Sequence, residues 1–148
     1  MTKTMVILMG LQGSGKSTFY HRYLQDDFVR VNLDTLKTRR QESRLIAYCI
    51  AEGKCFAVDN TNSTRADRQR YIQPAKAAGY RIVGCFMESK LRACIERNEQ
   101  RTGKAKVPAT AIAATSNKLQ IPNYEEGFDE LYFVKNDGQT MTVEKWRE

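Results

Sequence analysis

The 148-residue chain alternates between short apolar runs and longer segments of mixed polarity. Five runs, at residues 5–9, 28–31, 55–58, 81–86 and 131–134, are largely apolar in succession rather than at every second position. Such continuous runs are typical of parallel strands that helices cover on both faces. The segments between them have the length of helices, at residues 16–25, 34–52, 64–78, 89–98 and 108–119. We therefore expect an α/β fold with a five-stranded parallel sheet and helices on both faces.

Residues at the helix boundaries support this division. Ser63 or Thr64 is suited to cap the third helix, and Ser89 is suited to cap the fourth. The stretch after the fourth helix is polar and basic, and it contains a glycine. We interpret it as a mobile lid at about residues 98–107, on a single domain that spans 1–148.

The connection between the first strand and the first helix fits the pattern G-x-x-x-x-G-K-[ST] at every position. Its residues are Gly10, Leu11, Gln12, Gly13, Ser14, Gly15, Lys16 and Ser17. Glycines let the chain turn tightly, so that backbone N–H groups and the helix N-terminus face the phosphates of a nucleotide. Lys16 is expected to reach the β- and γ-phosphates, and Ser17 to ligate Mg²⁺. The motif thus predicts that ATP or GTP binds here with Mg²⁺, in the context of a P-loop protein.

In an open parallel sheet, ligands bind beyond the carboxyl ends of the strands. Asp34 follows the second apolar run, where it can face the γ-phosphate from the acceptor side and take a proton from an attacking hydroxyl. The alternative is that Asp34 only caps the helix that follows. Asp59 closes the third run, which makes it a candidate to hold a Mg²⁺ water or a substrate. Here the alternative is an Asx-turn, but Asp59 begins four consecutive hydrogen-bonding side chains that extend past Thr61.

Two arginines stand next to the predicted lid. Arg97 and Arg101 are four residues apart, so they share one face if the helix extends that far. A positive charge brought over the β–γ bridge stabilises the charge that develops during phosphoryl transfer. The alternative is an exposed helix face, since Glu99 lies between them.

Composition narrows the class of protein. The net charge is +7, and the segment between residues 61 and 106 contains eleven Lys or Arg but only four acidic residues. Such a segment attracts a polyanion such as nucleic acid, or forms solvated helix faces and arginines for ATP. The four cysteines show no C-x-x-C spacing, and no stretch approaches the ~20 apolar residues that span a bilayer. We therefore expect a reduced cytoplasmic protein with no membrane partner.

In these combined features the chain resembles the kinase domain of the polynucleotide 5′-hydroxyl kinases of phages and animals, within the P-loop kinase superfamily. The matching residues run from Gly10–Ser17 with Thr18, through Asn32-Leu33-Asp34 and Asp59-Asn60-Thr61-Asn62, to Arg97, Arg101 and Val107-Pro108. The resemblance implies transfer of the γ-phosphate of ATP to the 5′-OH end of DNA or RNA, as in nucleic acid repair. It implies a general base at Asp34, a lid arginine at Arg101, nucleotide contacts at Thr18 and Arg97, and acceptor-side roles for Asp59 and Thr61.

Two positions depart from the family pattern. Leu33 stands where the family has an arginine, and Lys37 matches an acceptor-binding arginine of the phage enzyme. Lys37 lacks the bidentate fork that suits a phosphate. The acceptor therefore remains open between a nucleic-acid end and a small molecule such as a nucleoside, sugar or antibiotic. A nucleotide-dependent binding module that hydrolyses ATP slowly is a third hypothesis.

Overall fold

The computed structural model describes residues 2–103 and 106–147. Its strands are β1 (Thr4–Met9), β2 (Val29–Val31), β3 (Phe56–Asp59), β4 (Arg81–Met87), β5 (Glu130–Asn136) and β6 (Met141–Lys145). Its α-helices are α1 (Lys16–Phe19), α2 (Leu33–Leu36), α3 (Arg39–Glu52), α4 (Arg65–Ala77), α5 (Leu91–Glu99) and α6 (Ala109–Lys118). A π-helical segment, η1 (Tyr20–Leu24), continues α1, and a 3₁₀ turn, η3 (Tyr124–Glu126), precedes β5.

One sheet organises the described residues, with the strand order β2-β3-β1-β4-β5-β6. The first five strands pair in parallel, as the apolar runs predict. The expected number of strands is wrong, because β6 adds an antiparallel edge strand to β5. The residues of β6 are mostly exposed, so they lack a continuous apolar run. Asp137-Gly138 after β5 is a recognised hairpin signal, and it could have revealed this strand.

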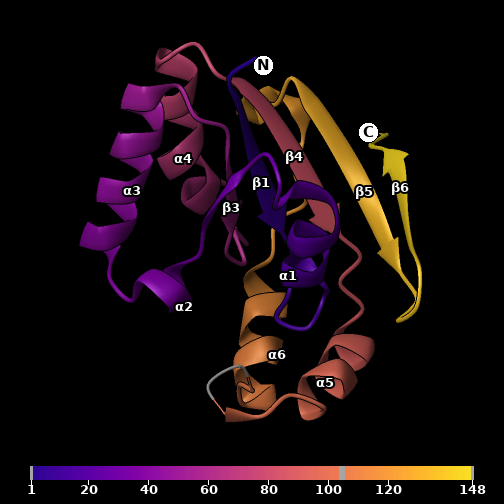
Figure 1. Cartoon of the computed structure of the whole chain (residues 1–148). Helices are drawn as coiled ribbons and strands as arrows, with labels where there is room; N and C mark the ends of the chain where they lie inside the picture. The colour runs from indigo at the N-terminus through magenta and orange to yellow at the C-terminus, as the bar shows by residue number, and fades with distance from the viewer. Residues whose placement is uncertain (1, 104–105, 148) are drawn as a thin grey trace.

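The two faces of the sheet bury different sets of side chains. In β1, Met5, Ile7 and Met9 pack with α3 and α4. Val6 and Leu8 point to the opposite face, which α1 and η1 cover. Figure 1 shows α3 and α4 together on one side of the sheet, and α1 on the other. Both faces of the central strands are therefore apolar, which explains their continuous hydrophobic sequence.

Two helices differ from the expected boundaries. The expected helix over residues 34–52 is interrupted at Lys37, whose φ of +74° ends α2 before α3 begins. Thr64 caps α4 as expected, by accepting from the N–H of Asp67 at 3.1 Å. Ser89 does not cap α5; its Oγ accepts instead from the N–H of Leu11 in the phosphate loop, at 3.1 Å. A side chain that sequence reading assigns to a helix end thus supports the site.

The carboxyl ends of the parallel strands meet the phosphate loop and α2. In Figure 1 the arrowheads of β1 and β4 point toward this end, and α5 and α6 lie beyond it. All four cysteines are buried, and no disulfide links them. Within the part of the chain that the structure describes, no helix is long and apolar enough to span a bilayer.

Candidate active site

The phosphate loop between β1 and α1 depends on its glycines. Gly10, Gly13 and Gly15 have φ angles of +148°, +82° and +103°, which side chains rarely allow. At Gly13 a Cβ would also collide with the backbone carbonyl of Cys94. The N–H groups of the first turn of a helix lack partners within the helix, so at the start of α1 they suit anionic oxygens. The loop is therefore shaped for a phosphate.

Lys16 lies inside the curve of this loop. Its Nζ donates to the carbonyl oxygens of Gly10, at 2.9 Å, and Leu11, at 2.8 Å. Only 9% of the residue is exposed, and desolvation by burial lowers the pKa of Lys16 to about 8, although the nearby Asp59 carboxylate acts in the opposite direction. The ammonium group is thus held beside the loop as a compact charge that can meet a phosphate oxygen.

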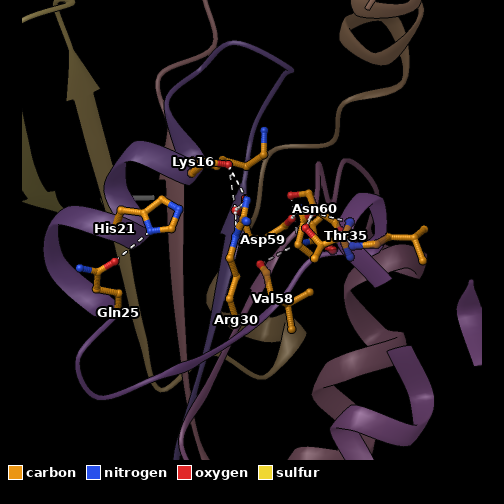
Figure 2. Close-up of polar contacts among 12 residues, drawn as sticks. Lys16, His21, Gln25, Arg30, Thr35, Val58, Asp59 and Asn60 are labelled. Carbon is orange, nitrogen blue, oxygen red and sulfur yellow. Dashed lines mark hydrogen bonds and ion pairs between the residues drawn. The ribbon is translucent and has the colours of Figure 1, made fainter. Parts of the chain in front are cut away.

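Ser17 and Asp59 meet next to the loop, and an arginine joins them. Ser17 Oγ donates to Asp59 Oδ2 at 3.0 Å. Arg30, from β2, donates through Nε to the same Oδ2 at 2.9 Å and through Nη2 to Ser17 Oγ at 2.8 Å. Figure 2 shows Arg30 reaching Asp59 from the neighbouring strand. Arg30 was not expected at the site, because a basic residue in a three-residue edge strand has no distinctive pattern.

The donor atoms of Ser17 and Asp59 fit a Mg²⁺ ion. Magnesium prefers hydroxyl, carboxylate and phosphate oxygens, and it keeps some of its water. Here a hydroxyl and a buried carboxylate lie within 3.0 Å of each other beside the phosphate loop. Among the described residues, no group of three His, Cys, Asp or Glu could hold a metal ion. The chemistry of this pair of oxygens fits Mg²⁺.

A cavity of about 290 Å³ joins the phosphate loop to α2. It is lined by Gln12, Gly13, Lys16, Ser17, Asn32, Leu33, Asp34, Arg39, Asp59, Asn60, Thr61, Arg101 and Val107. Asp34 is not the N-cap of the helix, because Asn32 accepts from the N–H of Thr35 at 3.0 Å. Asp34 thus lines the same cavity as Lys16 and Arg101.

A network of polar side chains behind this cavity holds the start of α2. Asn60 accepts from the N–H of Leu33 at 2.9 Å, and it donates to Glu42 at 3.1 Å and to the hydroxyl of Tyr71 at 3.2 Å. Arg39 donates to Glu42 at 2.9 Å and to Tyr71 at 2.8 Å. Burial and the neighbouring Glu42 raise the pKa of Tyr71, so the hydroxyl keeps its proton. This network fixes the backbone that carries Asp34.

The sequence did not predict this network, because its side chains come from three separate segments: α3, the residue after β3, and α4. The i, i+3 spacing of Arg39 and Glu42 was the one local signal. Of the two remaining acceptor-side candidates, Thr61 lines the cavity, and its carbonyl accepts from the N–H of Gly10 at 3.0 Å. Lys37 is exposed and is not among the lining residues.

A second cavity, of about 210 Å³, lies on the other side of the phosphate loop. It is lined by Gly13, Gly15, Thr18, Arg22, Arg97, Arg101, Asn136, Gly138, Gln139 and Met141. Arg97 donates to the carbonyl of Gly13 at 2.7 Å and to that of Asn136 at 3.1 Å, so it ties the loop to the end of β5. Arg101 is shared by both cavities. The contribution of Arg22 and of the β5–β6 turn was not anticipated.

The segment expected to form a lid has a fixed base. The side chain of Asn98 is fully buried. It donates to the carbonyl of Val107 at 2.6 Å and accepts from the N–H of the same residue at 3.0 Å. These two bonds close the base of the loop that carries Arg101. Residues 104 and 105 lie outside the described residues, and the mobility of the lid remains a prediction.

The phosphate loop lies at the carboxyl end of a parallel sheet and shares one cavity with Asp34. This arrangement is that of a P-loop kinase. Comparison with known proteins agrees with this class. Residues 5–122 match a family model described as AAA domain, and the chain belongs to that family.

Two relatives with similar names cover most of the chain. A protein of Acanthamoeba polyphaga mimivirus, provisionally named a bifunctional polynucleotide phosphatase/kinase, is 29% identical over 154 residues. The match covers 98% of this chain and 37% of the viral protein. The bifunctional polynucleotide phosphatase/kinase of Schizosaccharomyces pombe is 28% identical over 128 residues, covering 84% of this chain and 31% of that protein. The chain thus spans about a third of the length of these relatives.

Solved structures share the fold at low sequence identity. Kti12 of Chaetomium thermophilum, solved with ADP-AlF3, has a TM-score of 0.71 at 15% identity, with 90% of this chain and 89% of that chain covered. A gluconokinase of Sinorhizobium meliloti has a TM-score of 0.62 at 17% identity, with 90% and 82% covered. These likenesses establish the fold, which serves proteins of several activities.

Proposed function

We propose that this chain is an ATP-dependent phosphotransferase that moves the γ-phosphate to the 5′-OH end of DNA or RNA. The observation that carries the proposal is the single cavity lined by Lys16, Asp34, Asp59 and Arg101. A lysine and an arginine, which suit phosphate oxygens, share this cavity with a carboxylate that can take a proton from a hydroxyl. The names of the two relatives support the choice of a polynucleotide as acceptor.

The donor half of the site binds the nucleotide. Backbone N–H groups of Gly13 and Gly15 contact the phosphates, and Lys16 supplies a positive charge beside them. Mg²⁺ held by Ser17 and Asp59 would neutralise charge on the phosphates. The nucleobase and its sugar occupy the cavity of about 210 Å³ beside Thr18 and Arg97.

The acceptor half activates the hydroxyl. Asp34 takes the proton of the 5′-OH while the oxygen of that hydroxyl forms a bond to the γ-phosphorus. At the same time the bond between the γ-phosphorus and the β–γ bridging oxygen breaks. ADP leaves with the electrons of that bond. Arg101 stabilises the charge that accumulates on the transferred group, because it lines the space between the two halves.

Acceptor residues beyond Asp34 hold the rest of the substrate. Asp59 and Thr61 border the same cavity, and the cationic Arg39 lies at its edge. We assign Lys37 a weaker role as a solvent-exposed cation that attracts the phosphate backbone. The basic stretch between residues 61 and 106 contributes to the same attraction, although Arg68 and Arg97 within it bond to protein groups.

The test is an acceptor screen with γ-labelled ATP. DNA and RNA oligonucleotides with a 5′-OH are compared with the same oligonucleotides carrying a 5′-phosphate, and with gluconate and nucleosides. We expect label on the 5′-OH oligonucleotides alone, with Mg²⁺ required and with a steep loss of activity as salt is added. Transfer to a sugar or nucleoside, and to no oligonucleotide, would overturn the proposal.

A small-molecule kinase is the second candidate. Leu33 lines the acceptor cavity in the position where the polynucleotide kinases have a cation, and Lys37 lies away from that cavity. Both observations reduce the positive charge available to an acceptor phosphate. The same screen separates the two candidates, since a neutral acceptor makes no counterion-dependent contacts and its KM varies little with salt.

A further inference from the structure

Arg30 is the one basic side chain of β2, and it projects into the site from the neighbouring strand. Its Nη2 lies 2.7 Å from Asp59 Oδ2, and its side chain is 26% exposed. The guanidinium also lies over the ring of Tyr20, with 5.8 Å between Cζ and the ring centroid. Arg30 is therefore bonded at its tip, yet it retains a route to solvent.

The guanidinium bonds to both side chains that we assign to Mg²⁺. Ser17 Oγ accepts from Nη2 at 2.8 Å, and Asp59 Oδ2 accepts from Nε at 2.9 Å. Figure 2 shows Arg30 and Asp59 directed toward each other, beside Lys16. One monovalent cation thus takes the place between a hydroxyl and a carboxylate where the divalent ion is expected.

The burial of Asp59 explains why a cation is needed there. Only 2% of Asp59 is exposed, and a buried carboxylate is costly unless a cation and hydrogen bonds accompany it. Arg30 forms an ion pair with this carboxylate, while Lys16 Nζ donates to loop carbonyls. Arg30 is therefore the cation in direct contact with the Asp59 carboxylate.

A divalent ion and the guanidinium compete for the same place. Ser17 Oγ already donates its hydrogen to Asp59 and accepts from Arg30. A metal ion on that oxygen would lie within a few ångströms of the guanidinium, where like charges repel strongly because the site is partly buried. The two cations cannot both make these contacts.

We propose that Arg30 is an exchangeable counter-ion. In the nucleotide-free protein its guanidinium occupies the metal-binding position between Ser17 and Asp59, and it withdraws when Mg²⁺ enters with a nucleotide. This inference rests on the metal site of the proposed function. The withdrawn guanidinium remains against the Tyr20 ring, where a cation–π contact favours it, and its charge extends to solvent. Arg30 consequently excludes free divalent ions and admits those whose charge the nucleotide phosphates balance.

The test measures Mn²⁺ binding by electron paramagnetic resonance, with Mn²⁺ alone and with Mn²⁺ plus ADP. Arg30→Gln removes the charge and keeps an amide that can donate to Asp59, and we expect it to bind Mn²⁺ alone about tenfold or more tightly than the unaltered protein. Arg30→Lys keeps the charge and should remain close to the unaltered protein. Arg81→Gln is the matched control, because Arg81 pairs with Glu130 on the exposed surface and its loss removes the same net charge.

Unchanged or weaker Mn²⁺ binding by Arg30→Gln would overturn the inference. Asp59→Asn separates this failure from failure of the proposed metal site. If Asp59→Asn weakens Mn²⁺–ADP binding while Arg30→Gln does not change the affinity for Mn²⁺ alone, the proposed metal site is supported and the proposed role of Arg30 is wrong. If Asp59→Asn leaves Mn²⁺–ADP binding unchanged, the metal site is wrong, and the inference fails with it.

A measurement on the unaltered protein guards against a variant that does not fold. In ¹⁵N-arginine-labelled protein, the Nε–H signal of Arg30 is identified by its loss in Arg30→Lys. In the nucleotide-free protein, the hydrogen bond to Asp59 should protect this proton from exchange with water. We expect Mg²⁺–ADP to remove the protection. Protection that persists when Mg²⁺–ADP is bound would contradict the exchange.

Discussion

The donor and acceptor halves of the site are constructed in different ways. The phosphate loop is one continuous segment, and its lysine and glycines are held mainly by backbone groups of the loop and its neighbours. The acceptor half depends on side chains from separate elements, which meet at Asn60 and fix the first residues of α2. The donor half can therefore stay constant while the acceptor half changes. We therefore expect that proteins of this fold with different acceptors differ mainly in the side chains that support α2.

The largest expected effect separates chemistry from nucleotide binding. Asp34→Asn should lower kcat by about 10²- to 10⁴-fold, because the amide cannot take the proton of the hydroxyl. The dissociation constant for ADP, measured by calorimetry, should change little, since Asp34 belongs to the acceptor half. Asp27→Asn, at an exposed position before β2, is the control. Equal loss of ADP affinity in Asp34→Asn would mean that the halves are not separable.

A second variant disturbs only the support of the acceptor half. Asn60→Ala removes the acceptor for the Leu33 N–H and leaves Glu42 with one donor fewer. Leaving a partly buried donor without its acceptor costs about 1–3 kcal/mol, so kcat/KM for the hydroxyl acceptor should fall by about 5- to 150-fold. Steady-state kinetics measures this effect, and ADP affinity should be preserved. Asn117→Ala, on the exposed side of α6, should leave both quantities unchanged.

The donor half should respond to pH through Lys16. Burial lowers the pKa of Lys16 to about 8, so below that pH the free protein carries the ammonium that phosphate requires. Above it, ADP binding must be accompanied by uptake of a proton, and the dissociation constant should rise by up to about tenfold per pH unit. Calorimetry from pH 6.5 to 9.5 in buffers of different ionisation enthalpy measures both affinity and proton uptake. Flat affinity across this range would show that Lys16 stays charged without nucleotide.

The smallest expected effect distinguishes two cations on the acceptor side. Arg39 borders the cavity and Lys37 does not. Arg39→Ala should raise the acceptor KM by about 3- to 10-fold, as for one partly exposed charge-assisted bond, whereas Lys37→Ala should change it by less than about twofold. Each variant controls for the loss of charge in the other. A larger increase in the acceptor KM for Lys37→Ala than for Arg39→Ala would show that Lys37 contacts the acceptor.

The same comparison explains how much could be predicted from the sequence. The parallel strands follow from apolar runs, and Lys16 and Ser17 follow from a continuous motif, because both signals are local. Arg30, Asn60 and Glu42 could not be found in this way, since their roles come from hydrogen bonds between residues 13 to 29 positions apart in the chain. The antiparallel β6 was missed because its side chains are mostly exposed, so burial leaves no continuous pattern there. Local chemistry is readable from the sequence, and tertiary support is not.

The buried Arg68 has a consequence for the order in which the newly made chain can fold. Arg68 is fully buried, and its guanidinium forms two bonds to Glu126 and one to the carbonyl of Gln120. These partners lie 52 and 58 residues further along the chain, so a ribosome releases them well after α4. Until then, closing the core over Arg68 would enclose an unpaired charge, which is strongly unfavourable. During synthesis the core around Arg68 should therefore stay open until η3, which carries Glu126, has left the ribosome.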